Sequence, residues 1–144
     1  MTVPARMSVV TLGYRDLATM RSFYERLGWK SRSDDDEFVR FEVGGGSLTM
    51  FPLHLLAGEA NLPVAEPDGN FRGFTLAVVV ERREMVDAAI ADVERAGGRV
   101  LARPVDRDFG GYSGYFADPE DNVWEIVWAP GMSFDERGGL IWPE

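Results

Sequence analysis

Cysteine is absent from this chain, and histidine occurs only once, at His54. Without cysteine the protein can form no disulfide and can bind no metal through thiolates. A metal site that uses several histidines of one chain is excluded as well. The chain therefore has few of the side chains that usually bind transition metals.

Long apolar runs are also absent, and none approaches the length of a membrane-spanning helix. The first residues, MTVPARMSVV, have neither the apolar core nor the cleavage site of a secretory signal. We therefore expect a cytoplasmic protein with no membrane partner.

Basic residues are fewer than acidic ones. The chain has 15 Lys and Arg residues and 24 Asp and Glu residues, which gives a net charge of −9. Such a surface repels nucleic acid, so we expect no nucleic-acid partner. It would suit a cationic ligand, although solubility alone is the simpler explanation of the charge. With 45% hydrophobic residues among 144, the chain is long enough for one sizeable core and too short for two ordinary domains.

Apolar periodicity and turn residues predict the same order of elements twice along the chain. A strand, a helix and three further strands are predicted over residues 7–53 and again over residues 73–129. Asp16 is expected to cap the first helix, and Gly28 and Gly97 are placed to end the two helices. We call these two segments the first and second modules.

Two further segments lie outside the modules. Residues 54–72, rich in Gly, Pro, Asp and Asn, are predicted to form an exposed linker that begins with a short helical turn. Residues 131–144 form a tail whose apolar side chains should cover a sheet edge, cap a cavity or enter a dimer contact. We expect residues 1–130 to be a single domain. We also expect a homodimer, because open sheet edges need cover.

The predicted fold class is α+β. Each module has one helix, which can cover only one face of its sheet. We therefore expect the two modules to form a U-shaped mixed sheet around a cavity, with the helices on the outer face.

Glu125 lies within YFADPEDNVWEIVW, inside a segment that otherwise reads as a buried strand. A carboxylate in such a strand must be paired, protonated, bound to a metal or exposed to a wet cavity. Successive side chains of a strand point to opposite faces of the sheet. The large apolar side chains are expected on the face covered by the helix, and these are Trp124, Ile126 and Trp128. Glu125 is then predicted to face the cavity.

The same alternation predicts the remaining cavity lining. Pairing of the last two strands around the DPED turn places Tyr115 opposite Glu125. Simpler roles stay open: threonine is common in strands, Tyr115 could serve only as a cross-strand packing partner, and Glu125 could pair with Arg40 or with buried water. The predicted ligand-binding residues are Val9, Thr11, Thr49, Phe51, Thr75, Ser113, Tyr115 and Glu125.

The helix RDLATMRSFYERLGW, the segment GYSGYFADPEDNVWEIVW and the duplicated order resemble the vicinal oxygen chelate superfamily. That superfamily includes glyoxalase I, bleomycin-resistance proteins, fosfomycin-resistance enzymes and extradiol dioxygenases. The resemblance covers residues 7 to about 130. It implies a U-shaped cavity to which each module gives four strands. It also implies substrate contacts for Ser113 and Tyr115, since the fosfomycin-resistance branch has Ser and Tyr at similar positions.

The resemblance further implies four metal-ligand positions. They fall on Val9, Thr49, Thr75 (or its neighbour Phe74) and Glu125. Valine cannot bind a metal, and neutral threonine hydroxyls are poor substitutes for imidazole and carboxylate. We therefore expect no metal ligands and no cofactor.

Three functions compete at this point. The first is metal-independent binding of a small organic ligand or drug near Glu125, as in the bleomycin-resistance branch. The second is a metal-independent lyase or isomerase, akin to lactoylglutathione lyase, with Glu125 as general base and Tyr115 or Ser113 as donor. The third is a divalent-metal enzyme of the glyoxalase or dioxygenase type with an altered site that uses Glu125, His54 or water. The sequence favours the first function, because only one of the four metal-ligand positions carries a residue that binds metals well.

Overall fold

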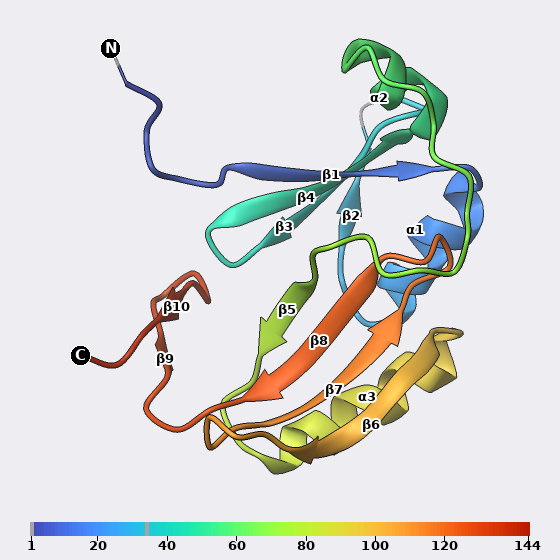
Figure 1. Ribbon diagram of the computed structural model, residues 1–144. Coiled ribbons are helices and arrows are strands. Elements are labelled where there is room, and N and C mark those ends of the chain that lie inside the picture. The colour runs from blue at the N-terminus through green and yellow to red at the C-terminus, as the bar shows by residue number, and fades with distance from the viewer. Residues whose placement is uncertain (1, 34) are drawn as a thin grey trace.

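The computed structural model describes residues 2–33 and 35–144 as an α+β fold with two four-stranded mixed sheets (Figure 1). Sheet 1 has the order β1-β4-β3-β2, and sheet 2 has the order β5-β8-β7-β6. The first module comprises β1 (Val9–Tyr14), α1 (Leu17–Arg26), β2 (Ser31–Arg32), β3 (Val39–Val43) and β4 (Gly46–Pro52). The second comprises β5 (Leu76–Val79), α3 (Glu84–Ala96), β6 (Arg99–Asp106), β7 (Tyr112–Ala117) and β8 (Val123–Trp128). The predicted fold class and the twofold repeat of element order are confirmed.

Strand pairing is equivalent in the two modules. The first strand of each module runs parallel to the fourth, β1 with β4 and β5 with β8, and the other pairs are antiparallel. In sheet 2, Tyr115 lies opposite Glu125 and Ser113 opposite Val127. The predicted register of this hairpin is therefore confirmed.

The helix boundaries follow from local chemistry. The Asp16 carboxylate accepts a hydrogen bond from the backbone N–H of Thr19 at 3.1 Å, which caps the start of α1. Gly28 and Gly97 follow the two helices with φ of 90° and 98°, a left-handed conformation that glycine adopts without a steric penalty.

One hydrophobic core runs through both modules. Met20, Phe23 and Tyr24 of α1 are fully buried, and Val86 and Ile90 of α3 are buried against sheet 2. The alternate residues of each strand take part in this core, as Leu12 and Tyr14 do on β1. We call these sides the covered faces of the sheets and the opposite sides the open faces.

Tyr24 joins the two modules through a buried hydrogen-bond network. Its hydroxyl donates to Asp118 Oδ2 at 2.6 Å and accepts from Trp124 Nε1 at 2.9 Å. Asp118 is 3% exposed, and burial raises the pKa of its carboxyl group. The same carboxylate accepts from the side-chain and backbone N–H groups of Asn122. Every polar atom of this network is thus satisfied away from water.

The two sheets remain separate within the described residues, because no strand of sheet 1 pairs with a strand of sheet 2. Aromatic side chains join them instead: Phe23 lies 6.1 Å from Phe116, and Trp29 lies 5.7 Å from Trp124, between ring centroids. Phe116 and Trp124 belong to the covered face of sheet 2. Since α1 contacts the covered faces of both sheets, the open faces lie on the sides turned away from it.

The linker and the tail both take defined positions. A short helix, α2 (Leu53–Glu59), follows β4, and residues 61–73 are exposed, as predicted. The tail forms a hairpin of β9 (Ser133–Phe134) and β10 (Leu140–Ile141). A Cβ atom added to Gly44 would lie 2.5 Å from the carbonyl oxygen of Gly138, so the hairpin contacts the β3–β4 turn through two glycines. None of the described helices is long and apolar enough to cross a membrane.

Tyr24→Phe tests whether the buried hydroxyl joins the modules. The substitution leaves Trp124 Nε1 without its acceptor and removes a donor from Asp118. We expect the free energy of unfolding to fall by about 1–3 kcal/mol, the usual cost of unsatisfied buried groups. Denaturant unfolding measures it.

Tyr14→Phe is the matched control, because it removes one hydrogen bond to the backbone carbonyl of Glu37 within the first module. An equal loss of stability in the two variants would contradict the role assigned to Tyr24.

Candidate functional site

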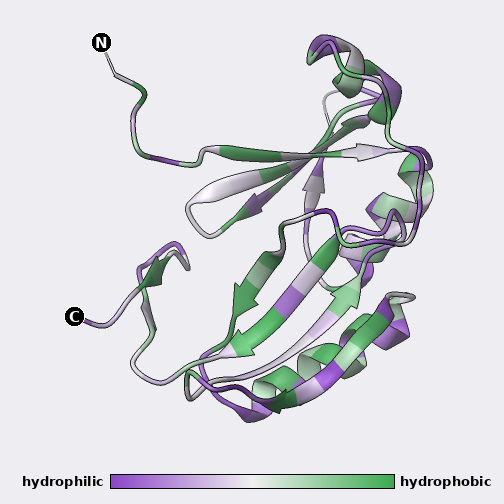
Figure 2. Ribbon diagram, in the orientation of Figure 1, coloured by the Kyte–Doolittle hydropathy of each residue, from purple (hydrophilic) through white to green (hydrophobic). Residues whose placement is uncertain are grey.

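A polar cluster lies on the open face of sheet 2. Glu125 alternates with the covered residues Trp124 and Ile126 on β8, and Tyr115 lies opposite it on β7. Both side chains are half-buried, whereas Ser113, two residues along β7, is fully buried. The hydrophilic band within the otherwise apolar β8 ribbon is visible in Figure 2. A single carboxylate is thus held in a largely apolar strand.

Tyr115 is the partner of Glu125. Its hydroxyl donates to Glu125 Oε2 at 2.9 Å. Burial, followed by the hydrogen bond to Glu125 and the charge of that carboxylate, raises the pKa of Tyr115. The alternative in which Glu125 pairs with Arg40 is wrong, because among the described residues no hydrogen bond or ion pair joins the two side chains and Glu125 accepts from Tyr115 instead.

Arg107 is a member of this cluster that the sequence did not indicate. Its Nε donates to Ser113 Oγ at 2.8 Å, and its Nη2 donates to the Ser113 carbonyl at 3.1 Å. Its guanidinium carbon lies 5.4 Å from the centroid of the Tyr115 ring. The guanidinium therefore lies over the open face of sheet 2, beside Tyr115.

A tight turn between β6 and β7 brings Arg107 to this position. Its backbone N–H donates to the carbonyl of Gly111 at 2.8 Å, and the N–H of Gly110 donates back to its carbonyl at 3.0 Å. Gly110 has a φ of 89°, which the turn requires and glycine allows. The Gly-Gly pair after Arg107 is the only signal in the sequence that the chain turns back here, and it does not say where the side chain lies.

A second cluster lies on the open face of sheet 1. The hydroxyl groups of Thr11 and Thr49 are 2.8 Å apart and share a hydrogen bond, and Thr49 is buried. Val9 and Phe51 lie on the same face by alternation, with Val9 exposed and Phe51 half-buried. Thr75 precedes β5, is exposed and belongs to neither cluster.

The eight predicted ligand-binding residues thus fall on two sheets. The structure brings Ser113, Tyr115 and Glu125 together, and it brings Thr11 and Thr49 together. Within the described parts of the chain, no hydrogen bond or ion pair joins the sheet 1 cluster to the sheet 2 cluster. The sheet 2 cluster carries the charged groups Glu125 and Arg107, so we take it as the candidate functional site.

The residues at the four metal-ligand positions do not fit a divalent ion. Val9 and Thr49 lie on sheet 1, Thr75 and Glu125 belong to the second module, and only Glu125 is a strong donor. Over residues 2–33 and 35–144, no three His, Asp or Glu side chains gather closely enough to hold a metal. His54 lies in α2, which packs against β1 and β4 rather than sheet 2. A divalent cation needs several charged or imidazole ligands to replace its water.

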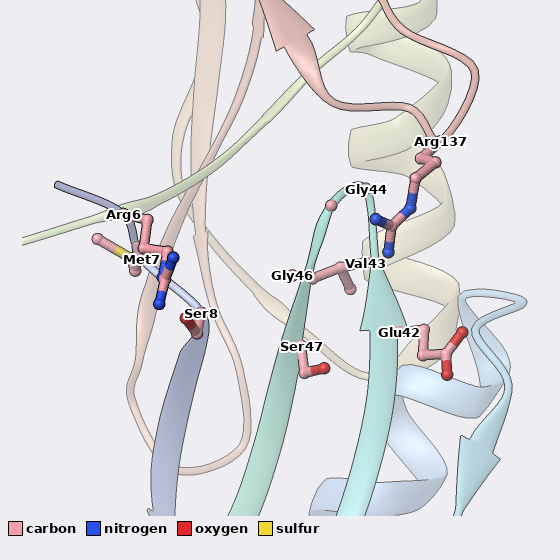
Figure 3. Close-up of a pocket in the computed structure, with 10 residues that line it drawn as sticks. Arg6, Met7, Ser8, Glu42, Val43, Gly44, Gly46, Ser47 and Arg137 are labelled. Carbon is pink, nitrogen blue, oxygen red and sulfur yellow. The ribbon is translucent and has the colours of Figure 1, made fainter. Parts of the chain in front are cut away.

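A cavity of about 660 Å³ lies elsewhere (Figure 3). It is formed where the segment before β1, the β3–β4 turn and the tail hairpin meet, and it contains none of the eight predicted residues. Arg6 and Arg137 lie on either side of the turn in this view. A smaller cavity of about 210 Å³ adjoins it and includes Val9.

Comparison with known proteins agrees with this architecture. The family model described as the Glyoxalase/Bleomycin resistance protein/Dioxygenase superfamily matches residues 6–126. None of the curated proteins matches the chain.

Several solved structures share the fold. A glyoxalase-related enzyme from Fulvimarina pelagi is 25% identical, with a TM-score of 0.88 over 98% of this chain and 100% of that one. A glyoxalase/bleomycin resistance protein/dioxygenase family enzyme from Burkholderia phytofirmans is 23% identical, with a TM-score of 0.69 over 84% and 96%. A lactoylglutathione lyase from Agrobacterium tumefaciens is 20% identical, with a TM-score of 0.65 over 89% and 96%.

Titration of Tyr115 tests the geometry of the candidate site. In Glu125→Gln the phenol loses a charged acceptor, so we expect the pKa of Tyr115 to fall toward the ordinary tyrosine value. It should stay above that value, because burial contributes the largest part of the shift. Carbon-13 NMR of labelled tyrosine measures the pKa residue by residue.

Tyr112 serves as the internal reference, since its raised pKa comes first from its hydrogen bond to Asp87 and should not change. A Tyr115 pKa that is the same in the wild type and in Glu125→Gln would show that the two groups do not interact in solution.

Proposed function

The chain belongs to the glyoxalase, bleomycin resistance protein and dioxygenase superfamily, and from this premise we propose that it binds a small organic molecule on the open face of sheet 2, without a metal ion. The observation that carries the proposal is the half-buried Tyr115–Glu125 pair. Apolar residues surround it on the same face, among them Ala77, Val123 and Val127. A few polar groups on an apolar surface are typical of small-molecule sites.

Metal independence is supported by the donor set. Three of the four positions that correspond to ligands in metal enzymes of the superfamily carry Val9, Thr49 and Thr75, whose side chains cannot offset the dehydration of a divalent cation. The remaining carboxylate, Glu125, then acts on the ligand directly. It is suited to an ammonium group or another hydrogen-bond donor.

The alternative of a lyase or isomerase that uses Glu125 as general base would employ the same pair of side chains. It stays a prediction from the sequence, as does the cytoplasmic location.

We also propose that the protein acts as a homodimer. Several large apolar side chains are exposed on the two modules, including Val9 on β1 and Leu101 and Val105 on β6. Trp142 of the tail is 71% exposed. Exposed apolar side chains of this kind are typical of subunit interfaces.

Light scattering on the purified protein tests the dimer. We expect twice the mass of the 16.1 kDa chain at micromolar concentration. Leu101→Glu with Val105→Glu should shift the equilibrium toward the monomer, because charged groups are costly in an interface core. A wild-type protein that stays monomeric at high concentration would rule the dimer out.

Glu125→Gln tests the binding site. We use phenethylammonium as the probe, since it joins an apolar ring to a cation, and measure its affinity by ligand-observed NMR with EDTA present. We expect a loss of about 10-fold or more in affinity, in line with about 1.5–3 kcal/mol for a hydrogen bond to a charged group. The free energy of unfolding should change by less than about 1 kcal/mol.

Glu42→Gln is the matched control, because it removes one exposed carboxylate from β3 of sheet 1. The proposal fails if Glu125→Gln binds the probe as the wild type does, or if EDTA abolishes binding by the wild type.

A further inference from the structure

Two opposite charges lie on the open face of sheet 2 without pairing with each other. Glu125 accepts a hydrogen bond from Tyr115, and the guanidinium of Arg107 lies over the ring of the same tyrosine. Among the described residues, neither Arg107 nor Glu125 forms an ion pair. The phenol of Tyr115 is thus the contact that both charged groups share.

Arg107 retains hydrogen-bonding capacity. A guanidinium has five N–H donors, and the two bonds to Ser113 use one on Nε and one on Nη2. These bonds hold the side chain in place, because Ser113 is itself fully buried. The remaining donors are available to a carboxylate or phosphate, which guanidinium groups bind in a fork geometry.

Glu125 can also accept further hydrogen bonds. Tyr115 donates to Oε2, and no described donor is bonded to Oε1. Half-buried charged groups that are not paired within the protein are stabilised by water or by a ligand of opposite charge. A ligand that contacts both groups would therefore need a charge of each sign.

We propose that the ligand of this site is a small zwitterion. Its carboxylate or phosphate binds Arg107, its ammonium group binds Glu125, and its body lies across Tyr115. This inference rests on the proposed function and adds the class of ligand. A simple cation would be repelled by Arg107, and a simple anion would be repelled by Glu125 and by the net charge of −9.

Three probes that share a phenyl ring test the proposal: phenylalanine, phenethylammonium and 3-phenylpropanoate. We expect the wild type to bind phenylalanine about 10-fold or more tightly than either singly charged probe, since it alone engages both groups. Ligand-observed NMR or calorimetry measures the three affinities.

Arg107→Gln identifies the anion contact. Glutamine keeps a donor that can reach toward Ser113 but removes the charge. We expect the affinity for phenylalanine to fall by about 10-fold or more, to that of phenethylammonium, while the affinity for phenethylammonium itself does not fall. Arg107→Lys keeps the charge, so it should retain part of the preference for phenylalanine over phenethylammonium. It replaces the glutamine variant in the test if that variant does not fold.

Arg103→Gln is the matched control. It removes one arginine from β6, the strand that ends just before Arg107, and this side chain pairs with Glu94 of α3 rather than with the site. It should leave the order of the three affinities unchanged.

The outcomes separate the two proposals. If phenylalanine binds the wild type no more tightly than phenethylammonium, or if Arg107→Gln leaves the preference unchanged, the ligand is not a zwitterion and the binding function stands. If none of the three probes binds the wild type, both proposals fail.

Discussion

The buried hydroxyl of Tyr24 is the contact on which the arrangement of the two modules depends. It lies between Asp118 and Trp124, so helix α1 of the first module is bonded to the turn and the last strand of the second. A polar group at this depth has to be satisfied, and a shifted helix would leave Trp124 Nε1 without a partner. Helix α1 contacts the covered faces of both sheets through its aromatic side chains, so the open faces are the sides turned away from it.

The candidate site follows from this division of the sheets. Alternation along β8 places Trp124 and Ile126 in the core and leaves Glu125 on the other side. Tyr115 donates a hydrogen bond to this carboxylate, which is half-buried rather than enclosed in the core. At the four positions that the resemblance to metal-binding members of the superfamily gives as ligands, three side chains, those of Val9, Thr49 and Thr75, are apolar or neutral.

Much of this could be predicted from the sequence, because the signals are local. The cap at Asp16, the helix ends at Gly28 and Gly97, and the pairing of Tyr115 with Glu125 across one hairpin depend on residues at most 10 positions apart. The separation of the two sheets could not be predicted, since it depends on aromatic contacts between Phe23 and Phe116 that are distant along the chain. Arg107 was missed for a related reason. It lies in a turn, where strand alternation does not say on which face a side chain lies.

We propose that the open face of sheet 2 binds a ligand directly through Glu125, with no metal ion between them. A crystal structure of the protein soaked with phenylalanine, with anomalous data collected for transition metals, tests it most directly. We expect ligand density across Tyr115, with the ammonium group near Glu125 and the carboxylate near Arg107. An anomalous peak bonded to Glu125, or a ligand bound only in the cavity beside the β3–β4 turn, would contradict it.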